Sequence, residues 1–188
     1  MMKINNELRD KCHEIACNLG WHKEEHSKGE CGMFVITEMS DAVKAYLNDR
    51  HANKKGFYKF NPDYGFEFRY NAYIQNTVEE NLADAIIRCL DLAAVCELDV
   101  ENLDGDIVPF DEVTPYINPT FPELVNEVIT FFCVENWGSQ RIYGLIISIL
   151  SYSKENDIDI LWYLEQKIDY SHIHAEKINA SKIKEIWK

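Results

Sequence analysis

Apolar residues recur every three or four positions along most of the chain, and this spacing is the strongest constraint on its fold. The first such run holds Ile4, Leu8, Cys12, Ile15 and Leu19. Gly20, directly after the run, is a typical helix terminator. Alternation of apolar and polar residues, the mark of a strand, is scarce. The sequence therefore predicts an all-α protein, organised as a helical bundle.

Further helices are predicted from the same spacing. They cover residues 32–50, 77–94, 122–138, 140–154 and 160–168. Thr77 and Glu80 form a capping-box pattern at the start of one of them, and Pro122 suits the first turn of another. The segment 57–73 breaks the pattern, since it holds eight aromatic residues. We expect it to form an aromatic loop or short hairpin that either caps the bundle or lines a base-binding pocket.

The chain is expected to form a single all-α domain over residues 1–188. Within it, residues 1–96 make a half with acidic motifs, 97–121 an acidic linker, and 122–188 a second helical half with its tail. A weak internal repeat, offset by 60 residues, aligns segments on both sides of this linker. Either the two halves are pseudo-repeats, or the similarity is the one expected between any two amphipathic helices.

The charge balance restricts the partners. The chain has 32 acidic and 19 basic side chains and a net charge of −13. This argues against a nucleic-acid polymer, because phosphate contacts need clustered Lys and Arg. It argues equally against an anionic membrane surface, and no apolar run approaches the roughly 20 residues of a spanning helix. The six cysteines include no C-x-x-C pair, and most fall at apolar positions of helical patterns, as buried free thiols do, so we expect a cytoplasmic protein.

Acidic residues interrupt two of the apolar helical faces. Glu38 and Asp41 are three apart on one predicted helix, and Asp84 lies among apolar neighbours on another, with Glu80 and Asn81 about one turn before it. If these helices face each other, the side chains form an oxygen-rich cage that suits Mg²⁺. The alternative is that the acids face solvent and that Glu80 only caps its helix.

Two of these segments resemble a known family. Residues 36–43 (ITEMSDAV) are similar to the first acidic E-x-x-E helix of the MazG-like, all-α nucleoside triphosphate pyrophosphohydrolases. Residues 79–88 (EENLADAIIR) are similar to their second acidic helix, E-E-x-L-A-D-x-x-I-R. With weaker similarity at residues 20–21 and 156–170, the resemblance covers most of residues 8–170. It identifies the chain as a divergent member whose fold would be the helical bundle of this family.

The resemblance implies an activity and a site. The activity is Mg²⁺-dependent hydrolysis of a (d)NTP to (d)NMP and pyrophosphate, by a protein that forms a homodimer. The implied catalytic acids are Glu38, Asp41 and Asp84, and the expected metal ligands are these three with Glu80 and Asn81. The triphosphate needs local positive charge, and the substrate-binding cations expected near the site helices are Lys44, Lys54 and Arg88, of which Arg88 lies within the matched motif. The substrate is a single nucleotide, which the excess of acids does not exclude when it arrives with magnesium.

Two departures from the family pattern favour a second hypothesis. Asn81 stands where a ligating Glu is usual, and Asp41 stands where the first helix usually has a second Glu. In addition, residues 170–177 lack the Arg and the Gly-Lys of related tails. The alternative is therefore a catalytically impaired MazG-like protein that acts as a nucleotide- or protein-binding module.

Other site chemistries have weaker support. His22 and His26 are spaced by one helical turn, with Cys12, His13, Cys17 and Cys31 nearby in sequence, which permits a zinc site. However, the run reads H-K-E-E-H rather than H-E-x-x-H, and the cysteines lack zinc-finger spacing. No Glu stands three residues before a histidine, as a ferritin-like di-iron site would need, and neither a phosphate-binding Gly-rich loop nor a G-x-S-x-G elbow is present.

Overall fold

The described parts of the chain are helical and contain no strand, which confirms the all-α prediction. The computed structural model describes residues 2–24, 26–101, 120–133 and 139–186, and for residues 62, 139 and 179–186 it describes the backbone alone. The elements are α1 (Asn6–Leu19), α2 (Lys28–Leu47), α3 (Lys54–Lys59), the 3₁₀ turn η1 (Pro62–Tyr64), α4 (Phe66–Tyr73), α5 (Val78–Val95), α7 (Phe121–Cys133), α8 (Ser139–Glu155) and α9 (Ile160–Ile186).

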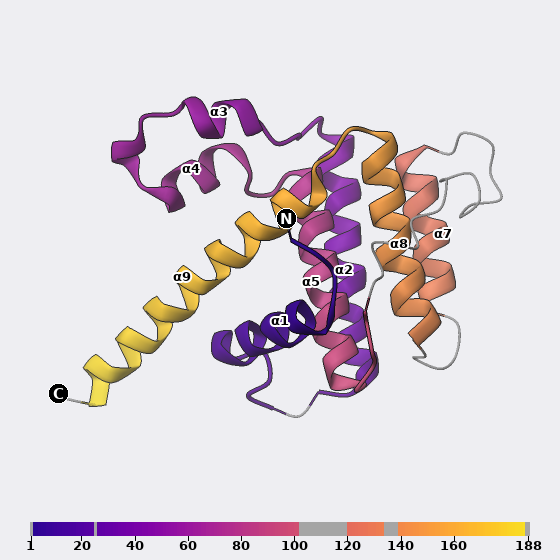
Figure 1. Cartoon of the computed structure of the whole chain (residues 1–188), viewed down its shortest axis with the longest axis horizontal. Coiled ribbons are helices and arrows are strands. Elements are labelled where there is room, and N and C mark those ends of the chain that lie inside the picture. The colour runs from indigo at the N-terminus through magenta and orange to yellow at the C-terminus, as the bar shows by residue number, and fades with distance from the viewer. Residues whose placement is uncertain (1, 25, 102–119, 134–138, 187–188) are drawn as a thin grey trace.

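Helix α5 is the centre of the bundle. It packs against α1, α2, α8 and α9, and its side chains are buried along almost its whole length. A helix that is apolar nearly all round is stable only when other helices cover it. Figure 1 shows α2 and α5 side by side in the middle, α7 and α8 on one flank, and α9 extending away towards the C-terminus. Any polar side chain on α5 is therefore held rigidly inside the protein.

Several helices end in the same kind of turn. In each turn one residue adopts the left-handed conformation: Gly20 after α1, Asp49 after α2, Glu97 after α5 and Asp157 after α8. The following N–H then bonds to a carbonyl five residues back, as from Leu98 to Ala93 at 2.9 Å and from Ile158 to Ser153 at 2.8 Å. The last two turns lie 60 residues apart, at matching positions of the internal repeat. Because α1 and α2 end in the same way, the turn is a common helix ending and does not by itself establish two repeated halves.

The aromatic segment 57–73 is not a loop or hairpin, so that prediction was wrong. It forms α3, η1 and α4, and α3 begins where the Asn53 side chain accepts a hydrogen bond of 2.8 Å from the Gly56 N–H. Phe57 and Tyr70 are buried against the bundle. The indole N–H of Trp162 in α9 donates to the Tyr58 hydroxyl at 2.6 Å, which joins this helical cap to α9.

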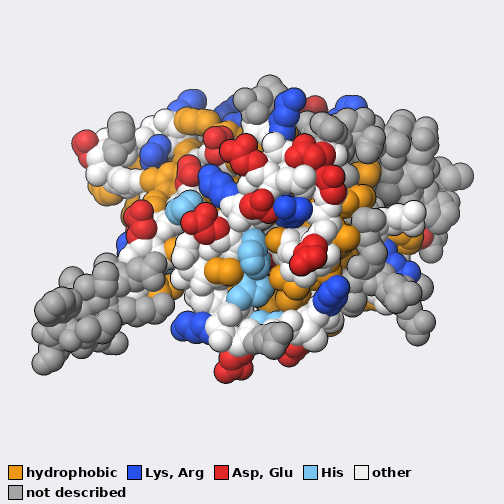
Figure 2. All heavy atoms as spheres, turned by 60° about the horizontal axis from the view of Figure 1, so that its bottom comes forward, with side chains coloured by type: hydrophobic (Ala, Val, Ile, Leu, Met, Phe, Trp, Pro, Cys, Tyr) orange, Lys and Arg blue, Asp and Glu red, His pale blue; other side chains and the backbone are white. Residues whose placement is uncertain are grey.

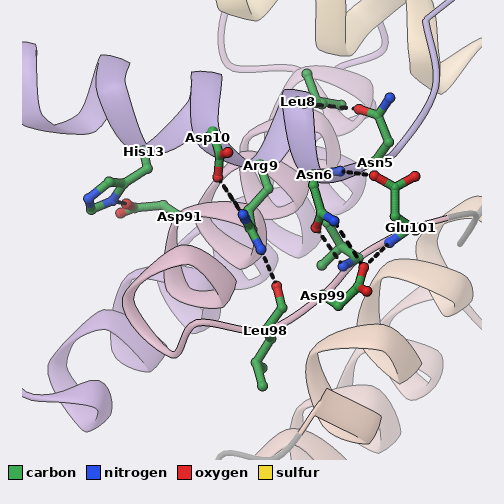
Figure 3. A network of polar contacts seen from close by, with 11 residues as sticks. Asn5, Asn6, Leu8, Arg9, Asp10, His13, Asp91, Leu98, Asp99 and Glu101 are labelled. Carbon is green, nitrogen blue, oxygen red and sulfur yellow. Dashed lines mark hydrogen bonds and ion pairs between the residues drawn. The ribbon is translucent and has the colours of Figure 1, made fainter.

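The beginning of the predicted acidic linker packs on the bundle. Val100 is fully buried, and its N–H donates to the Asn6 side chain at 3.0 Å. The Asn6 side chain also donates to Asp99, and the Asn6 N–H donates to Glu101 (Figure 3). Residues 98–101 are thus held against α1, although Asp99 and Glu101 stay exposed to solvent. The linker prediction for residues 102–119 lies outside the described residues.

The cysteines and the helix lengths bear on the expected environment. All six cysteines are free: Cys12, Cys31 and Cys89 are buried, Cys96 is half-buried, and Cys17 and Cys133 are exposed. Burial raises the pKa of the Cys12 and Cys89 thiols, so these side chains are unreactive packing groups. Among the described helices, none combines the length and apolar content needed to cross a lipid bilayer.

Candidate functional site

Three of the predicted acids converge where α2 faces α5. The two helices run antiparallel, because the Val78 N–H at the start of α5 donates to the Arg50 carbonyl just after α2, at 3.0 Å. This places Glu38 of α2 beside Asp84 and Glu80 of α5. Burial, followed by the nearby Asp84 charge, raises the pKa of Glu38 to about 7. We refer to Glu38, Glu80 and Asp84 as the carboxylate cluster.

Two cations contact the carboxylate cluster, Lys167 from the distant helix α9 and Arg88 from α5 itself. The Lys167 ammonium of α9 bonds to Glu80 and lies 2.8 Å from the Asp84 carboxylate. Burial alone would lower the Lys167 pKa, but the two carboxylates raise it more strongly, so the ammonium stays charged. Arg88 lies 3.5 Å from the Glu38 carboxylate. Its guanidinium covers the Trp21 ring, 3.2 Å from the centroid.

Glu80 is occupied by its own neighbours. Besides Lys167, it accepts hydrogen bonds from the Tyr70 hydroxyl at 2.9 Å and from the Asn76 N–H at 3.0 Å. Its own N–H donates to the Thr77 side chain at 3.3 Å, as the capping pattern predicts. Both carboxylate oxygens are therefore bonded within the protein. This position ties α4 to the start of α5.

Asp84 differs from Glu80 because half of its carboxylate has no partner. The residue is only 7% exposed. One oxygen faces Lys167, but Oδ1 is buried without a hydrogen bond. Buried polar atoms are nearly always satisfied, so an orphaned carboxylate oxygen points to a missing partner such as a water or an ion.

The remaining predicted ligands line a polar pocket one turn further along. Asp41 follows Glu38 by one turn of α2, and Asn81 precedes Asp84 by one turn of α5. The pocket has a volume of about 440 Å³ and is lined by Asp41, Lys44, Ala45, Asn48, Arg50, Asn76 and Asn81. This volume lies within the range of small-molecule sites. Lys44, one of the cations expected near the site helices, thus lines this pocket together with Arg50.

Lys54 lies elsewhere. Its ammonium is 2.6 Å from the Asp159 carboxylate and 4.5 Å from the centre of the Trp162 ring, so it joins α3 to the start of α9. It is not among the residues that line the polar pocket. Arg88 likewise contacts Glu38 and Trp21 rather than the pocket.

The donor set of this region fits Mg²⁺. It consists of the carboxylates of Glu38, Asp41 and Asp84 with the side-chain amide of Asn81, all oxygen ligands of the type that Mg²⁺ prefers. Within the described part of the chain, these acids do not bring three ligand atoms within 4.8 Å of one another. Because Mg²⁺ keeps several waters and takes few carboxylates directly, such a spread set remains suitable. The orphaned Asp84 oxygen supports the fit.

A different group of potential ligands forms where α1 meets α5. His13 Nδ1 lies 2.7 Å from Asp91, and His22 Nε2 lies 2.9 and 3.0 Å from its two oxygens. Figure 3 shows the His13 side chain against Asp91, and Figure 2 shows histidine side chains gathered at the surface of one face, between acidic and basic ones. The sequence spacing suggests His22 and His26 as a pair of metal ligands. In the structure His26 instead lies 3.9 Å from Glu30.

The sequence alone does not single out Lys167 or Asp91. Lys167 reads as one more basic residue on an amphipathic helix, and Asp91 as one more acid of the helical run that follows Asp84. Trp21 stands out only as part of a Gly-Trp pair. For Asp91 a signal existed, since it follows Asp84 by seven residues and so lies on the same helix face.

Comparison of the chain with family models, with curated proteins and with solved structures gives no match. The MazG-like resemblance therefore remains a prediction from the motifs, whereas the all-α fold is shown over the described residues.

Proposed function

We propose that the protein is a Mg²⁺-dependent nucleotide pyrophosphohydrolase that cleaves a (d)NTP to (d)NMP and pyrophosphate. The observation that carries this proposal is the polar pocket, because a carboxylate, three amides and two cations face one space beside the carboxylate cluster. Asp41 and Asn81 are in the pocket wall, and Glu38 and Asp84 lie one turn away. A mixture of acids and cations suits a ligand that is itself an anion carrying a divalent metal.

Each part of this site has a distinct task. Glu38, Asp41 and Asp84 would hold the metal, and the Asn81 amide would supply a neutral oxygen. Bound Mg²⁺ neutralises phosphate charge and activates a water for attack. Lys44 and Arg50 are exposed at the pocket and attract the phosphates. Arg88, stacked on Trp21, holds the Glu38 carboxylate in place.

The activity is tested with the purified full chain, Mg²⁺ and a panel of (d)NTPs, measuring pyrophosphate release. We expect release from at least one nucleotide and a loss of about 10²-fold or more in Glu38→Gln. Glu165→Gln, which removes an exposed acid of α9, is the matched control and should keep full turnover. Turnover that survives Glu38→Gln, or no release from any (d)NTP, would refute the proposal.

Asn81 offers a gain-of-function test. In Asn81→Glu the carboxylate that is usual at this position returns, so the concentration of Mg²⁺ needed for half-maximal turnover should fall severalfold. Asn48→Glu is the control, because it adds the same charge to the same pocket from the end of α2. If both variants change the Mg²⁺ requirement equally, the effect is general electrostatics and Asn81 is not a ligand position.

One observation favours the second candidate, a binding module without catalysis. Lys167 places a protein cation among the carboxylates, where the hydrolase would need its metal. In that case calorimetry should show nucleotide binding that is equally tight in Mg²⁺ and in EDTA, with no pyrophosphate released. The hydrolase requires tighter binding of nucleotide in Mg²⁺. The homodimer that the resemblance implies is tested separately, by sedimentation of the same protein.

A further inference from the structure

A second cluster of metal-binding side chains lies two turns along α5 from Asp84. The seven residues between Asp84 and Asp91 correspond to about 10 Å of helix. At this point His13 from α1 and His22 from the turn after α1 both reach Asp91. The three donor atoms lie within 4.8 Å of one another, and within the described residues this is the one group of three His, Cys, Asp or Glu side chains that does so.

We propose that His13, His22 and Asp91 form a binding site for a divalent transition metal of the Zn²⁺ class. Two imidazole nitrogens and one carboxylate oxygen are donors that zinc prefers, whereas Mg²⁺ and Ca²⁺ take oxygen ligands. This site is separate from the proposed hydrolase site and does not depend on it.

The geometry needs little change to accept the ion. In a tetrahedral zinc site with bonds of about 2.0–2.1 Å, neighbouring ligand atoms are about 3.3 Å apart. The contacts of Asp91 with His13 at 2.7 Å and with His22 at 2.9 Å are a few tenths of an ångström shorter. These contacts are hydrogen bonds when the imidazoles carry their protons. Metal binding replaces those protons, so the same three side chains serve both states.

The surroundings favour an ion over a purely structural hydrogen-bond cluster. Asp91 is only 4% exposed, and among the described residues its hydrogen-bond partners are the two imidazoles, with no Lys or Arg. A buried carboxylate is costly unless a cation compensates it. The His13 side chain is 37% exposed, which leaves room on the solvent side for water as a fourth ligand. On its other nitrogen, the His13 ring has the Cys17 sulfur at 3.7 Å, an outer contact that orients the ring.

The metal would join three segments. His13 lies within α1, His22 lies just after the turn fixed by Gly20, and Asp91 lies on the central helix. Trp21, next to His22, is the ring that Arg88 covers. Binding at His22 would therefore also fix the turn that carries Trp21, so the site acts as a clip between α1 and α5.

The test uses the full chain, freed of metal with EDTA and then titrated with ZnCl₂ in a calorimeter. We expect one equivalent to bind and the melting temperature to rise. His22→Gln should weaken binding by at least about 100-fold, since even loss of an outer contact costs 10–100-fold. His26→Gln is the matched control, because it removes a neighbouring histidine outside the cluster and should leave binding unchanged.

Four further measurements make the result specific. A large excess of Mg²⁺ should not displace the zinc, and Glu38→Gln should bind zinc as the parent protein does, so failure of the hydrolase proposal leaves this one intact. Co²⁺ should show ligand-field bands without a thiolate charge-transfer band, because no cysteine is a ligand. Melting of His22→Gln in EDTA verifies that it is folded. Failure to bind one equivalent of Zn²⁺, or equal binding by parent and His22→Gln, would overturn the site.

Discussion

Helix α5 carries two buried acid sites that are compensated in opposite ways. At Asp84 the charge is balanced by protein cations, since Lys167 contacts both Asp84 and Glu80. At Asp91 the described partners are imidazoles, on which an incoming metal can replace the N–H protons that are then released to solvent. A metal at the first site must compete with a fixed ammonium, whereas a metal at the second displaces only protons. We therefore expect these two sites of one helix to differ in how readily they take up an ion.

The largest effect is expected from removing the ammonium. Lys167→Met leaves Glu80 and Asp84 buried without their cation, which should lower the free energy of unfolding by about 3–5 kcal/mol. The measurement is urea denaturation in EDTA. Lys177→Met is the control. Lys177 lies on the same helix as Lys167, but its ion pair with Glu67 of α4 is at the surface, and such pairs are worth about 0–1 kcal/mol.

Mg²⁺ sharpens this experiment. If the carboxylate cluster can hold the ion, Mg²⁺ should stabilise Lys167→Met more than the parent protein, because the competing ammonium is gone. Equal losses in Lys167→Met and Lys177→Met would show that Lys167 is not the compensating charge. The contrast between Asp84, balanced by an ammonium, and Asp91, contacted by imidazoles, would then be wrong.

The second effect is a pH dependence due to Glu38. Its pKa is raised from 4.5 to about 7 in the folded protein, so folding favours the protonated form. The resulting stabilisation is complete below pH 4.5 and is lost as the pH rises through 7. In EDTA, the free energy of unfolding should therefore fall by on the order of 2–3 kcal/mol over this range relative to Glu38→Gln.

Urea denaturation at a series of pH values checks this, with Glu38→Gln as the reference that cannot titrate. The difference between the two proteins, rather than either curve alone, reports on Glu38, because other acids titrate in both. Parallel curves between pH 4.5 and 7 would mean that Glu38 is not buried beside Asp84 as described.

The sequence located the carboxylates better than the groups that compensate them. Glu38 and Asp84 could be predicted because an acid on an apolar helical face is a local signal. Lys167 could not, because its position opposite Asp84 depends on how α9 crosses α5, more than 80 residues further along the chain. The partner of His22 could not be predicted either, because it also depends on how distant segments pack. The helical period suggested His26, whereas the turn at Gly20 directs His22 back to Asp91.

The segment 57–73 shows a second limit of prediction. Gly56, Pro62 and Gly65 broke it into runs too short to show a helical period, so a loop or hairpin was expected. Each run nevertheless forms a short helical element, with Asn53 capping the first. Such short helices are marginal alone and are stabilised here by burying Phe57 and Tyr70, a tertiary effect that no local pattern reports.

A smaller effect is expected at Arg88, which lies between the two acid sites. Arg88→Lys keeps the charge near Glu38 but loses the planar stack on Trp21, which should cost about 1–2 kcal/mol. The control is Arg69→Lys, where the guanidinium lies over Phe57 at 4.8 Å. Thermal or urea unfolding measures both. If Arg88→Lys also weakens zinc binding, the Trp21 turn connects the two sites; unchanged zinc affinity would show that they are independent.

The smallest effect on stability concerns Lys54, for which the sequence and the geometry suggest different tasks. Its contact with Asp159 is largely exposed, so Lys54→Met should cost less than about 1 kcal/mol. Because Lys54 does not line the polar pocket, the KM for nucleotide should not change. Lys44→Met, at the pocket itself, should raise KM about tenfold, equivalent to 1.4 kcal/mol. A larger rise in KM for Lys54→Met than for Lys44→Met would show that the nucleotide binds at the surface where α3 meets α9 rather than in the pocket. The phosphates would then approach the carboxylate cluster from that surface.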